Sequence, residues 1–528
     1  MRRSLIFITF FVFLLITRVV VADYWYVDRD ASGSNNGSSW FDAWRAFDDI
    51  RWNSVSPGDT IFISGGPFTK TYYETLRIGK SGTLDNPISI KTGAVSPNPS
   101  GHEGRVVIDA NDTLNNFIVI GSHDYIHIDG NDGSGGRNIY CEESVQHGII
   151  SSSPSIGLVI KYVHLYDMGN SDQGDSGNGM WLGGLRGKSE IAFCYIDTTW
   201  RHGLLIGGQP NASSYGEHFS LHDSTIIGAG EDAINANGGF DLYNNVIGRF
   251  RMTGTEYSDG IQYFGGYVRI YNNLWHENYP SDPGVGQRVN AMVFMSMGSG
   301  SITQYDHHQI FNNLFIASDW SYDDGGHNRA ILYKHTTGMS PEIDLRDVLV
   351  ANNTMIGYSS AFAINPYSSS CTYTNLRIKN NIIMDGRLSF ISMGMNFDSA
   401  NSTIEIEDNL FYYRSGRCSQ NLFSFDGSSY ESLGDFETNV SAASSNEWGD
   451  PSFVAFVEGD YDNSDYHLSS TDTKAIDLAQ TLSDFFKDKD GVFRPQGGGW
   501  DIGAFEYTTS NPSNSINPNP PMNLRILE

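Results

Sequence analysis

A short phrase of five residues recurs six times between Asn178 and Pro366, and it constrains the fold more than any other feature. Each copy has a polar residue, then Gly or Ala, an apolar residue, a variable residue and usually a second apolar residue. The copies begin at Asn178, His202, Asp232, Asp259, Asn290 and Arg329, and shorter matches begin at His147 and Ser360. A unit this short cannot bury its apolar side chains alone. The repeats must therefore stack on one another, which predicts a solenoid.

A second phrase, a short apolar run closed by Asn-Asn or Asp-Asn, follows the later copies. The spacing from Asn244 to Asn272 is 28 residues, and from Asn272 to Asn312 it is 40. The apolar runs alternate with a period of two and contain many β-branched and aromatic residues, which is typical of strands. Asn accepts a left-handed backbone at a tight turn, and stacked Asn amides can bond along a ladder. We therefore expect an all-β, parallel solenoid with one rung per repeat.

These two phrases together resemble the rungs of the right-handed parallel β-helix in the pectate-lyase-like superfamily. The resemblance covers roughly residues 24–507. It implies a single-stranded right-handed parallel β-helix in which one sheet face, with the loops before it, holds the substrate. It implies less about the reaction, because one fold carries many activities.

The beginning of the chain carries an export signal. Arg2 and Arg3 precede the apolar run Leu5–Ile16, and Val20-Val21-Ala22 matches a cleavage site, so residues 1–22 are interpreted as a signal peptide. The apolar run is shorter than a membrane span requires. We therefore expect a secreted protein, extracellular or at the cell surface, with no membrane span after cleavage.

The remaining chain divides into four parts. Residues 23–66 are expected to cap the first coil, and Ser39 can begin a short capping helix because aromatic residues follow it at helical spacing. Residues 67–447 are assigned to the β-helix. Residues 448–507 are expected to form an irregular cover over the last coil, and residues 508–528 a tail rich in Pro, Asn and Ser.

Charge and cysteine content narrow the possible partners. A net charge of −28 argues against binding nucleic acid through its phosphates. The cysteines are far apart, without metal-ligand spacing: Cys141, Cys194, Cys371 and Cys418. Cys194 occupies the place of the second Asn of later rungs, so it is expected in a stacked core. The oligomeric state and any disulfide pairing stay open.

Aligning the phrases predicts one continuous outer face. The third and fifth residues should point inward, and alternation then sends the second, fourth and sixth outward. Rungs lie about 4.8 Å apart, so the outward residues of successive rungs form a strip. The long loops 249–258, 276–289 and 317–328 are expected to wall a groove beside it. The outward set is Trp181, Leu205, Asn235, Asn237, Gln262, Phe264, Val293, Met295, Leu332 and Lys334.

The favoured hypothesis is a lyase that cleaves an acidic, uronate-containing polysaccharide in this groove. A base would remove the proton beside a uronate carboxylate while a cation neutralises that carboxylate. The candidates for base and cation are Lys334, Arg329 and His202, and the candidates for holding Ca²⁺ are Asp232, Glu256 and Asp259. The residues expected to contact substrate are Trp181, Asn235, Asn237, Gln262, Phe264 and His335.

Two alternatives remain beside the lyase. Asp232 and Asp259 begin successive rungs, so they could be the paired carboxylates of a glycoside hydrolase, near the shorter separation that retaining enzymes use. The chain lacks a complete set of polygalacturonase motifs, and it shows no pectate-lyase catalytic signature. It could equally be a non-catalytic adhesin or glycan-binding protein, with Asp232 and Asp259 as turn caps and Lys334 as a solvated lysine. The sugar is left open.

Overall fold

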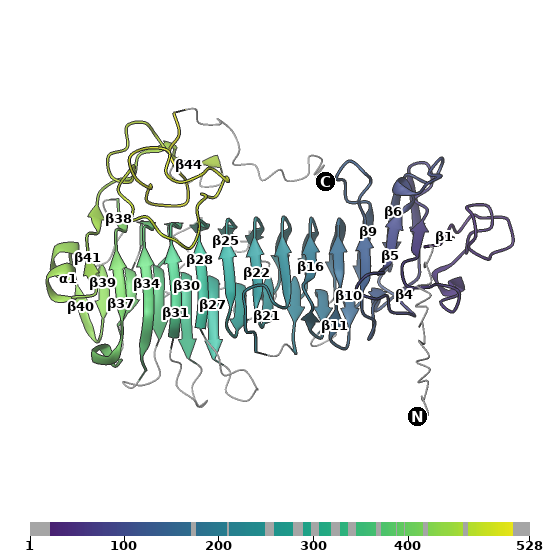
Figure 1. Ribbon diagram of the computed structural model, residues 1–528, viewed down its shortest axis with the longest axis horizontal. Coiled ribbons are helices and arrows are strands. Elements are labelled where there is room, and N and C mark those ends of the chain that lie inside the picture. The colour runs from purple at the N-terminus through teal and green to yellow at the C-terminus, as the bar shows by residue number, and fades with distance from the viewer. Residues whose placement is uncertain are drawn as a thin grey trace, which may run out of the picture.

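The computed structural model describes most of the chain. The described residues are 22–169, 176–208, 211–248, 258–277, 289–296, 306–317, 328–335, 345–365, 371–386, 388–394, 397–414, 421–457 and 463–509. Three long sheets run along the molecule, and the chain passes through them in turn, once per coil (Figure 1). All neighbouring strands in these sheets are parallel except the last pair, β39 and β40. The predicted all-β class and parallel β-helix are confirmed.

The three sheets, named A, B and C here, take their strands in chain order with regular steps. Sheet A has β1 (Tyr24–Val27), β2 (Thr60–Ile63), β5 (Ile88–Thr92), β8 (Ile126–Asp129), β12 (Val159–Lys161), β16 (Ser189–Ala192), β19 (Phe219–His222), β22 (Phe240–Tyr243), β25 (Val268–Tyr271), β28 (Asp306–Phe311), β31 (Leu345–Ala351), β34 (Tyr373–Lys379), β37 (Ile404–Glu407) and β41 (Ala443–Ser444). Sheet B has β3 (Thr69–Tyr72), β6 (Arg105–Asp109), β9 (Ile139–Ser144), β13 (Val163–Met168), β17 (Tyr195–Thr199), β20 (Thr225–Ala229), β23 (Val246–Gly248), β26 (Leu274–Glu277), β29 (Leu314–Ala317), β32 (Thr354–Ile356), β35 (Ile382–Met384), β38 (Leu410–Tyr412) and β42 (Glu447–Trp448). Sheet C has β4 (Leu76–Arg77), β7 (Asn116–Val119), β10 (His147–Ser151), β14 (Asn178–Leu182), β18 (Leu204–Ile206), β21 (Ile234–Asn237), β24 (Ser258–Phe264), β27 (Val289–Ser296), β30 (Arg329–His335), β33 (Ser360–Asn365), β36 (Ser389–Met393), β39 (Phe423–Phe425) and β40 (Ser428–Tyr430).

The smaller elements lie outside these three sheets. Two short pairs are β11 (Ser155–Ile156) with β15 (Leu185–Arg186), and β43 (Phe453–Ala455) with β44 (Asp465–Leu468). The helical elements are the 3-10 turns η1 (Phe47–Asp49), η2 (Gly93–Val95) and η3 (Ser399–Asn401), and the α-helix α1 (Leu433–Asn439). Within the described ranges, no helix is long and apolar enough to cross a membrane. The predicted signal peptide falls almost wholly outside those ranges and stays a prediction.

Apolar side chains of equivalent rungs stack inside the coils. Ile261 on β24 is in register with Met292 on β27, which is in register with Ile331 on β30. All three are fully buried in one continuous core that runs the length of the molecule. Burial of each such side chain stabilises the fold by about 1.5–3 kcal/mol. The core therefore holds the rungs in a fixed register, and that register positions the residues on the outside.

The paired asparagines turn the chain between sheets A and B. The first Asn of a pair is left-handed, with φ of 57° at Asn244 and 54° at Asn312. The second is buried, and its amide bonds to the equivalent amide of the next rung. Asn273 Nδ2 donates to Asn313 Oδ1 and Asn313 Nδ2 to Asn353 Oδ1, each at 3.0 Å. The predicted ladder is confirmed. Cys194 extends this stacked series toward the N-terminus, because its backbone N–H donates to Ser224 Oγ at 3.0 Å.

The predicted helix in the N-terminal cap is wrong. Ser39 Oγ does accept from the backbone N–H of Asp42 at 3.1 Å, as a helix cap would. Trp44, however, gives its N–H to Tyr26 O at 2.9 Å and accepts from Asp28 N at 2.8 Å, so strand pairing takes the groups that a helix needs. The segment contains only η1. The single α-helix of the described residues, α1, lies at the opposite end, where Phe436 stacks on Phe423 at 4.4 Å.

The C-terminal segment, residues 448–507, lies along the outside of sheets A and B rather than over the last coil (Figure 1). Phe485 stacks on Phe311 of β28 with ring centroids 4.3 Å apart. Asn352 Nδ2 donates to Asp501 O at 2.9 Å, and the buried pair Arg494–Glu506 closes at 2.9 Å. This cover is therefore fastened to the outer wall, away from sheet C.

Candidate active site

The first residues of the six phrases form a column on sheet C. The third residues of successive phrases pair in order: Met180 with Leu204, Leu204 with Ile234, Ile234 with Ile261, Ile261 with Met292 and Met292 with Ile331. Asn178, His202, Asp232, Asp259 and Asn290, here named the polar column, therefore follow one another rung by rung. This confirms the predicted alignment of the phrases.

The predicted outward direction of each phrase's second residue is wrong. A Cβ on Gly203 would lie 2.4 Å from Ile226 Cγ2, and one on Gly260 would lie 2.9 Å from the Trp275 ring. Ala233 is fully buried in the main core. The chain thus bends where it enters sheet C, so that the second and third residues both face the core. The first residue shares the outside with the fourth, and Asn235 Nδ2 donates to Asp232 Oδ2 at 3.0 Å.

Asp232 and Asp259 are two buried carboxyl groups on adjacent rungs, 2 % and 5 % exposed. The backbone N–H of Asp259 donates to Asp232 Oδ1 at 3.3 Å, and Asn290 Nδ2 donates to Asp259 Oδ1 at 2.9 Å. Burial, with the nearby charge of Asp259, raises the pKa of Asp232 well above its ordinary value. Burial raises the pKa of Asp259 to about 6, against the lowering effect of its bonds from Asn290. Near neutral pH the pair therefore holds a proton that ordinary aspartates have lost.

A third carboxylate, Glu231, and two basic residues, Arg201 and His202, complete the cluster. Arg201 Nε lies 2.5 Å from Glu231 Oε2. His202 lies between carboxylates, with Nε2 3.6 Å from Glu231 Oε2 and Nδ1 3.5 Å from Asp232 Oδ2. The sequence-based predictions missed Glu231 and Arg201. Each directly precedes the first residue of its phrase, which was the available signal.

The remaining predicted residues spread along the same face. Asn235 Nδ2 also donates to Gln262 Oε1 at 2.8 Å, so both amides belong to the cluster. Lys334 is exposed, two rungs past Asp259, and its positive charge lowers the pKa of Asp259. Arg329 is half-buried at the start of the same strand, β30.

Four other predicted positions have different outcomes. Trp181 is exposed two rungs before Asp232, and Asn237 is half-buried. Phe264 is 8 % exposed, so it is not presented to a ligand as predicted. His335 lies in β30 opposite Ser296, but its side chain is outside the described residues, as are Glu256 and most of the three predicted wall loops.

The predicted calcium ligands are only partly described. Asp232 and Asp259 both accept N–H bonds, from Asn235 and from Asn290. Among the described residues, no group of three or more His, Cys, Asp or Glu side chains is arranged to hold a metal ion. Because Glu256 is not described, the predicted three-residue set stays a prediction.

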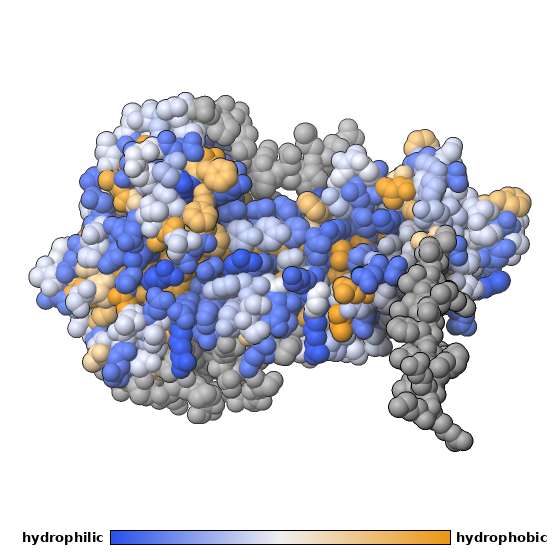
Figure 2. Space-filling view, in the orientation of Figure 1, coloured by the Kyte–Doolittle hydropathy of each residue, from blue (hydrophilic) through white to orange (hydrophobic). Residues whose placement is uncertain are grey.

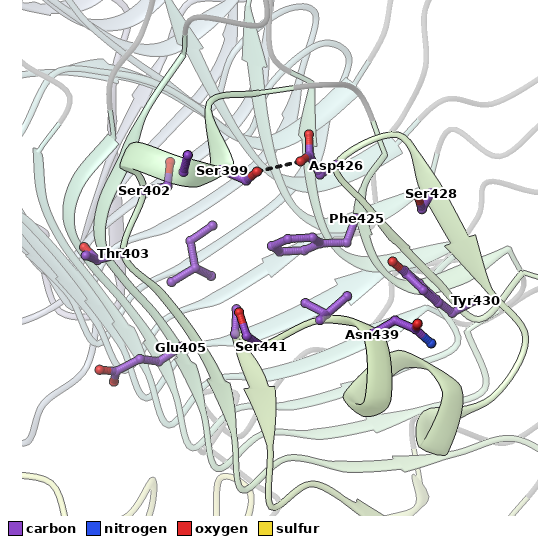
Figure 3. Close-up of a pocket in the computed structure, with 14 residues that line it drawn as sticks. Ser399, Ser402, Thr403, Glu405, Phe425, Asp426, Ser428, Tyr430, Asn439 and Ser441 are labelled. Carbon is purple, nitrogen blue, oxygen red and sulfur yellow. Dashed lines mark hydrogen bonds between the residues drawn. The ribbon is translucent and has the colours of Figure 1, made fainter.

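A cavity of about 600 Å³ lies far from this cluster, beside α1 at the C-terminal end of the coils (Figure 3). Its lining includes Phe425 and Tyr430, and it contains two carboxylates. Both carboxylates have partners: Glu405 pairs with Lys379 at 2.6 Å, and Asp426 accepts from Ser399 Oγ at 2.6 Å. None of the predicted site residues lines this cavity, so it is separate from the polar column.

No protein-family model matches the chain, and no curated protein matches it. Solved structures similar to it include the pectate lyase Pel9A, with 15 % identity over 92 % of this chain and 96 % of that one, at a TM-score of 0.44. They also include the GH136 lacto-N-biosidase from Eubacterium ramulus, with 12 % identity over 81 % of this chain and 68 % of that one, at a TM-score of 0.42. The structure of XylC with xylose has 12 % identity over 92 % of this chain and 98 % of that one, at a TM-score of 0.42. The parallel β-helix of this chain is shown by its own three parallel sheets.

Proposed function

We propose that this protein is a glycoside hydrolase that acts on a polysaccharide, with Asp232 and Asp259 as its catalytic carboxyl groups. The observation that carries the proposal is the pair itself. The two carboxyl groups sit on adjacent rungs, are shielded from water, and have raised pKa values. Two carboxyl groups at this spacing, one protonated and one ionised, are what a retaining glycosidase uses as acid and nucleophile.

Asp232, whose pKa is raised by burial and by the charge of Asp259, is the proton donor to the glycosidic oxygen. Asp259 is ionised above about pH 6 and is the group that attacks the anomeric carbon. Adjacent rungs lie about 4.8 Å apart, close to the separation of about 5–5.5 Å used by retaining glycosidases. The leaving alcohol takes the proton of Asp232, and an ester forms between the sugar and Asp259. Water, deprotonated by Asp232, then releases the sugar and restores both groups.

The surrounding side chains support these roles. Asn290 donates to Asp259 Oδ1, which fixes the direction of the nucleophile. Asn235 bonds to both Asp232 and Gln262, so the amides tie the acid to the outer face that a polymer would touch. His202 lies between Asp232 and Glu231, and Glu231 holds Arg201. These contacts restrict the rotamers of the reacting groups, as a preorganised site requires.

A second candidate is the polysaccharide lyase suggested by the sequence. It is favoured by Lys334, which is exposed on the same face and close enough for its charge to lower the pKa of Asp259. In that reaction Lys334 would remove the proton beside a uronate carboxylate, and Arg329 on the same strand would neutralise the carboxylate. The product would then carry a carbon–carbon double bond, which a hydrolase product lacks.

A panel of neutral and uronate polysaccharides tests both candidates. We expect new reducing ends without absorbance from unsaturated products, and a loss of roughly 10²-fold or more in kcat for Asp259→Asn. Asp129→Asn, a half-buried carboxylate on sheet A, is the control and should keep full activity. Azide should restore turnover to Asp259→Ala as a glycosyl azide. Rising absorbance that requires Lys334 would establish the lyase instead, and neither signal on any glycan would leave the binding-only alternative.

The pH profile gives a second check. The low-pH limb of kcat/KM should fall with a midpoint near 6, because Asp259 must be ionised. In Asp259→Ala with azide present this limb should disappear. A limb that persists unchanged in that variant would show that another group titrates there.

A further inference from the structure

We infer that Trp181 and two bare glycine positions beside it form a subsite for an uncharged sugar, two rungs from Asp232. The inference rests on the proposed function, because it names the class of polymer that the acid pair would cleave. It predicts a neutral sugar unit about two positions from the scissile bond.

Trp181 presents its ring on the outer face of sheet C. It is the fourth residue of its phrase, in register with Ile150 of β10 and Leu205 of β18. The side chain is 39 % exposed although it lies in the middle of a strand. His147 packs its ring edge against the indole, with centroids 5.0 Å apart and an interplanar angle of 60°. The indole is thus held in one orientation with part of its surface open, which is the arrangement that stacks on the C–H face of a pyranose.

The surface beside the Trp181 ring lacks side chains at two positions. The sixth residues of the Trp181 phrase and the next one are Gly183 and Gly207, whereas the following two rungs carry Asn237 and Phe264. A Cβ placed on Gly207 would meet nothing within 4 Å, so open space lies above the backbone there, whereas a Cβ on Gly183 would lie 3.1 Å from the backbone oxygen of Ser151. Figure 2 shows hydrophobic surface at the place where Figure 1 labels β10 and β11. Because Gly183 and Gly207 have no side chains, a sugar can lie flat beside the Trp181 ring.

Among the described residues, the fourth and sixth positions on this part of the face carry no charge. The fourth and sixth residues of β10, β14 and β18 and of their turns are Ile150, Ser152, Trp181, Gly183, Leu205 and Gly207. Burial lowers the pKa of His147 to about 4, so its ring is neutral near pH 6. Arg201, on the neighbouring rung, is engaged by Glu231. A uronate here would lose water without gaining a cation, whereas a neutral sugar would gain apolar contact.

The distance matches a polymer that runs along the coils. Rungs repeat every ~4.8 Å, close to the length of one pyranose unit, so two rungs span about two units. Toward the other end of the face, Lys334 supplies positive charge two rungs past Asp259. The face is thus neutral and aromatic on the N-terminal side of the acid pair and cationic on the other. A homopolymer of uronates fits the neutral half poorly.

Binding and cleavage are measured separately. Cellohexaose and xylohexaose, with an oligogalacturonate hexamer as the charged counterpart, are titrated into Asp259→Asn protein with and without Trp181→Ala. We expect at least one neutral hexamer to bind, with roughly tenfold weaker affinity for Trp181→Ala and partial recovery for Trp181→Phe. Trp448→Ala is the matched control, because Trp448 is 37 % exposed on the last rung of sheet B, and its affinity should not change.

The outcomes separate this inference from the proposed function. Binding that depends on Trp181 supports the subsite even if protein with Asp259 intact does not cleave the hexamers. The absence of cleavage would overturn only the hydrolase proposal. Cleavage whose KM is the same in Trp181→Ala overturns only the subsite. The subsite is also overturned if neither neutral hexamer binds, or if the oligogalacturonate binds more tightly in a Trp181-dependent way.

Discussion

Replacement of Asn313 by Ala should lower the stability of the coils more than any surface change of the same size. Asn313 is fully buried in the middle of the amide ladder. Its Nδ2 donates to Ile270 O at 2.8 Å, Phe311 O at 3.1 Å and Asn353 Oδ1 at 3.0 Å. Its Oδ1 accepts the backbone N–H and the Nδ2 of Asn273, each at 3.0 Å. The substitution therefore removes five contacts from a place that water does not reach.

The size of the effect follows from these contacts. The two Nδ2 hydrogens serve three acceptors, so the loss amounts to about four full hydrogen bonds at about 1 kcal/mol each, or about 4 kcal/mol in all. Asn313→Asp should cost more than Asn313→Ala, because it places an oxygen against three oxygens and brings a charge into the core. The ladder is continuous, so the damage should spread to both neighbouring rungs.

Urea denaturation followed by circular dichroism measures the change in the free energy of unfolding. Asn401→Ala is the control, since Asn401 bonds to Asp398 on the exposed turn η3 and should cost less than about 1 kcal/mol. An Asn313→Ala cost as small as the control, or an Asp variant more stable than the Ala variant, would refute the view that the ladder holds the rungs together.

Two further predictions concern the cover on sheets A and B. His467 bonds to Asp465 at 2.6 Å and Asp490 at 2.8 Å, and although burial opposes its charge, these bonds raise its pKa. A raised histidine pKa contributes stability that is present below the ordinary histidine pKa and is lost as the pH rises through the raised value. The stability of the cover should therefore fall as the pH rises above the ordinary histidine pKa of about 6.5. Glu506→Gln should loosen the cover by about 3–5 kcal/mol, because it leaves the fully buried Arg494 without its charged partner.

Limited proteolysis between residues 448 and 507 measures both effects, with controls on the same segment. His467→Gln should be cleaved at the same rate across the pH range, and a pH dependence that survives this change would contradict the role of His467. Glu447→Gln removes an exposed partner of Lys474 and should cost less than about 1 kcal/mol. Cleavage of Glu506→Gln no faster than that of Glu447→Gln would contradict the buried-pair prediction.

The repeats allowed the fold to be predicted from the sequence. A left-handed turn followed by a buried amide favours Asn at both positions, so Asn312-Asn313 indicated a conformation as well as a spacing. The N-terminal cap failed because helical spacing of Trp44 and Phe47 cannot reveal a competing strand. Trp44 is buried in both arrangements, so its burial was predictable while its backbone partner, Tyr26, was not.

The candidate site could be predicted only in part, because the direction of its side chains depends on how the chain bends as it enters sheet C. Strict alternation holds along the middle of a strand, but the first two residues of the phrase lie where the chain bends as it enters sheet C, and alternation does not apply there. Gly260 and Ala233 are small because they turn inward at that bend. The same bend turns Asp259 and Asp232 outward on adjacent rungs.

This bend explains why the acid pair sits where it does. A carboxyl group pointing into the lumen would be excluded, and one in the middle of the outer face would be open to water with an ordinary pKa. The first position of the phrase lies between these limits. Its side chain is outside the core but covered, and the next rung supplies a backbone N–H, as Asp259 does for Asp232 and Asn290 for Asp259. Stacking two aspartates at this position therefore buries both carboxyl groups and raises both pKa values.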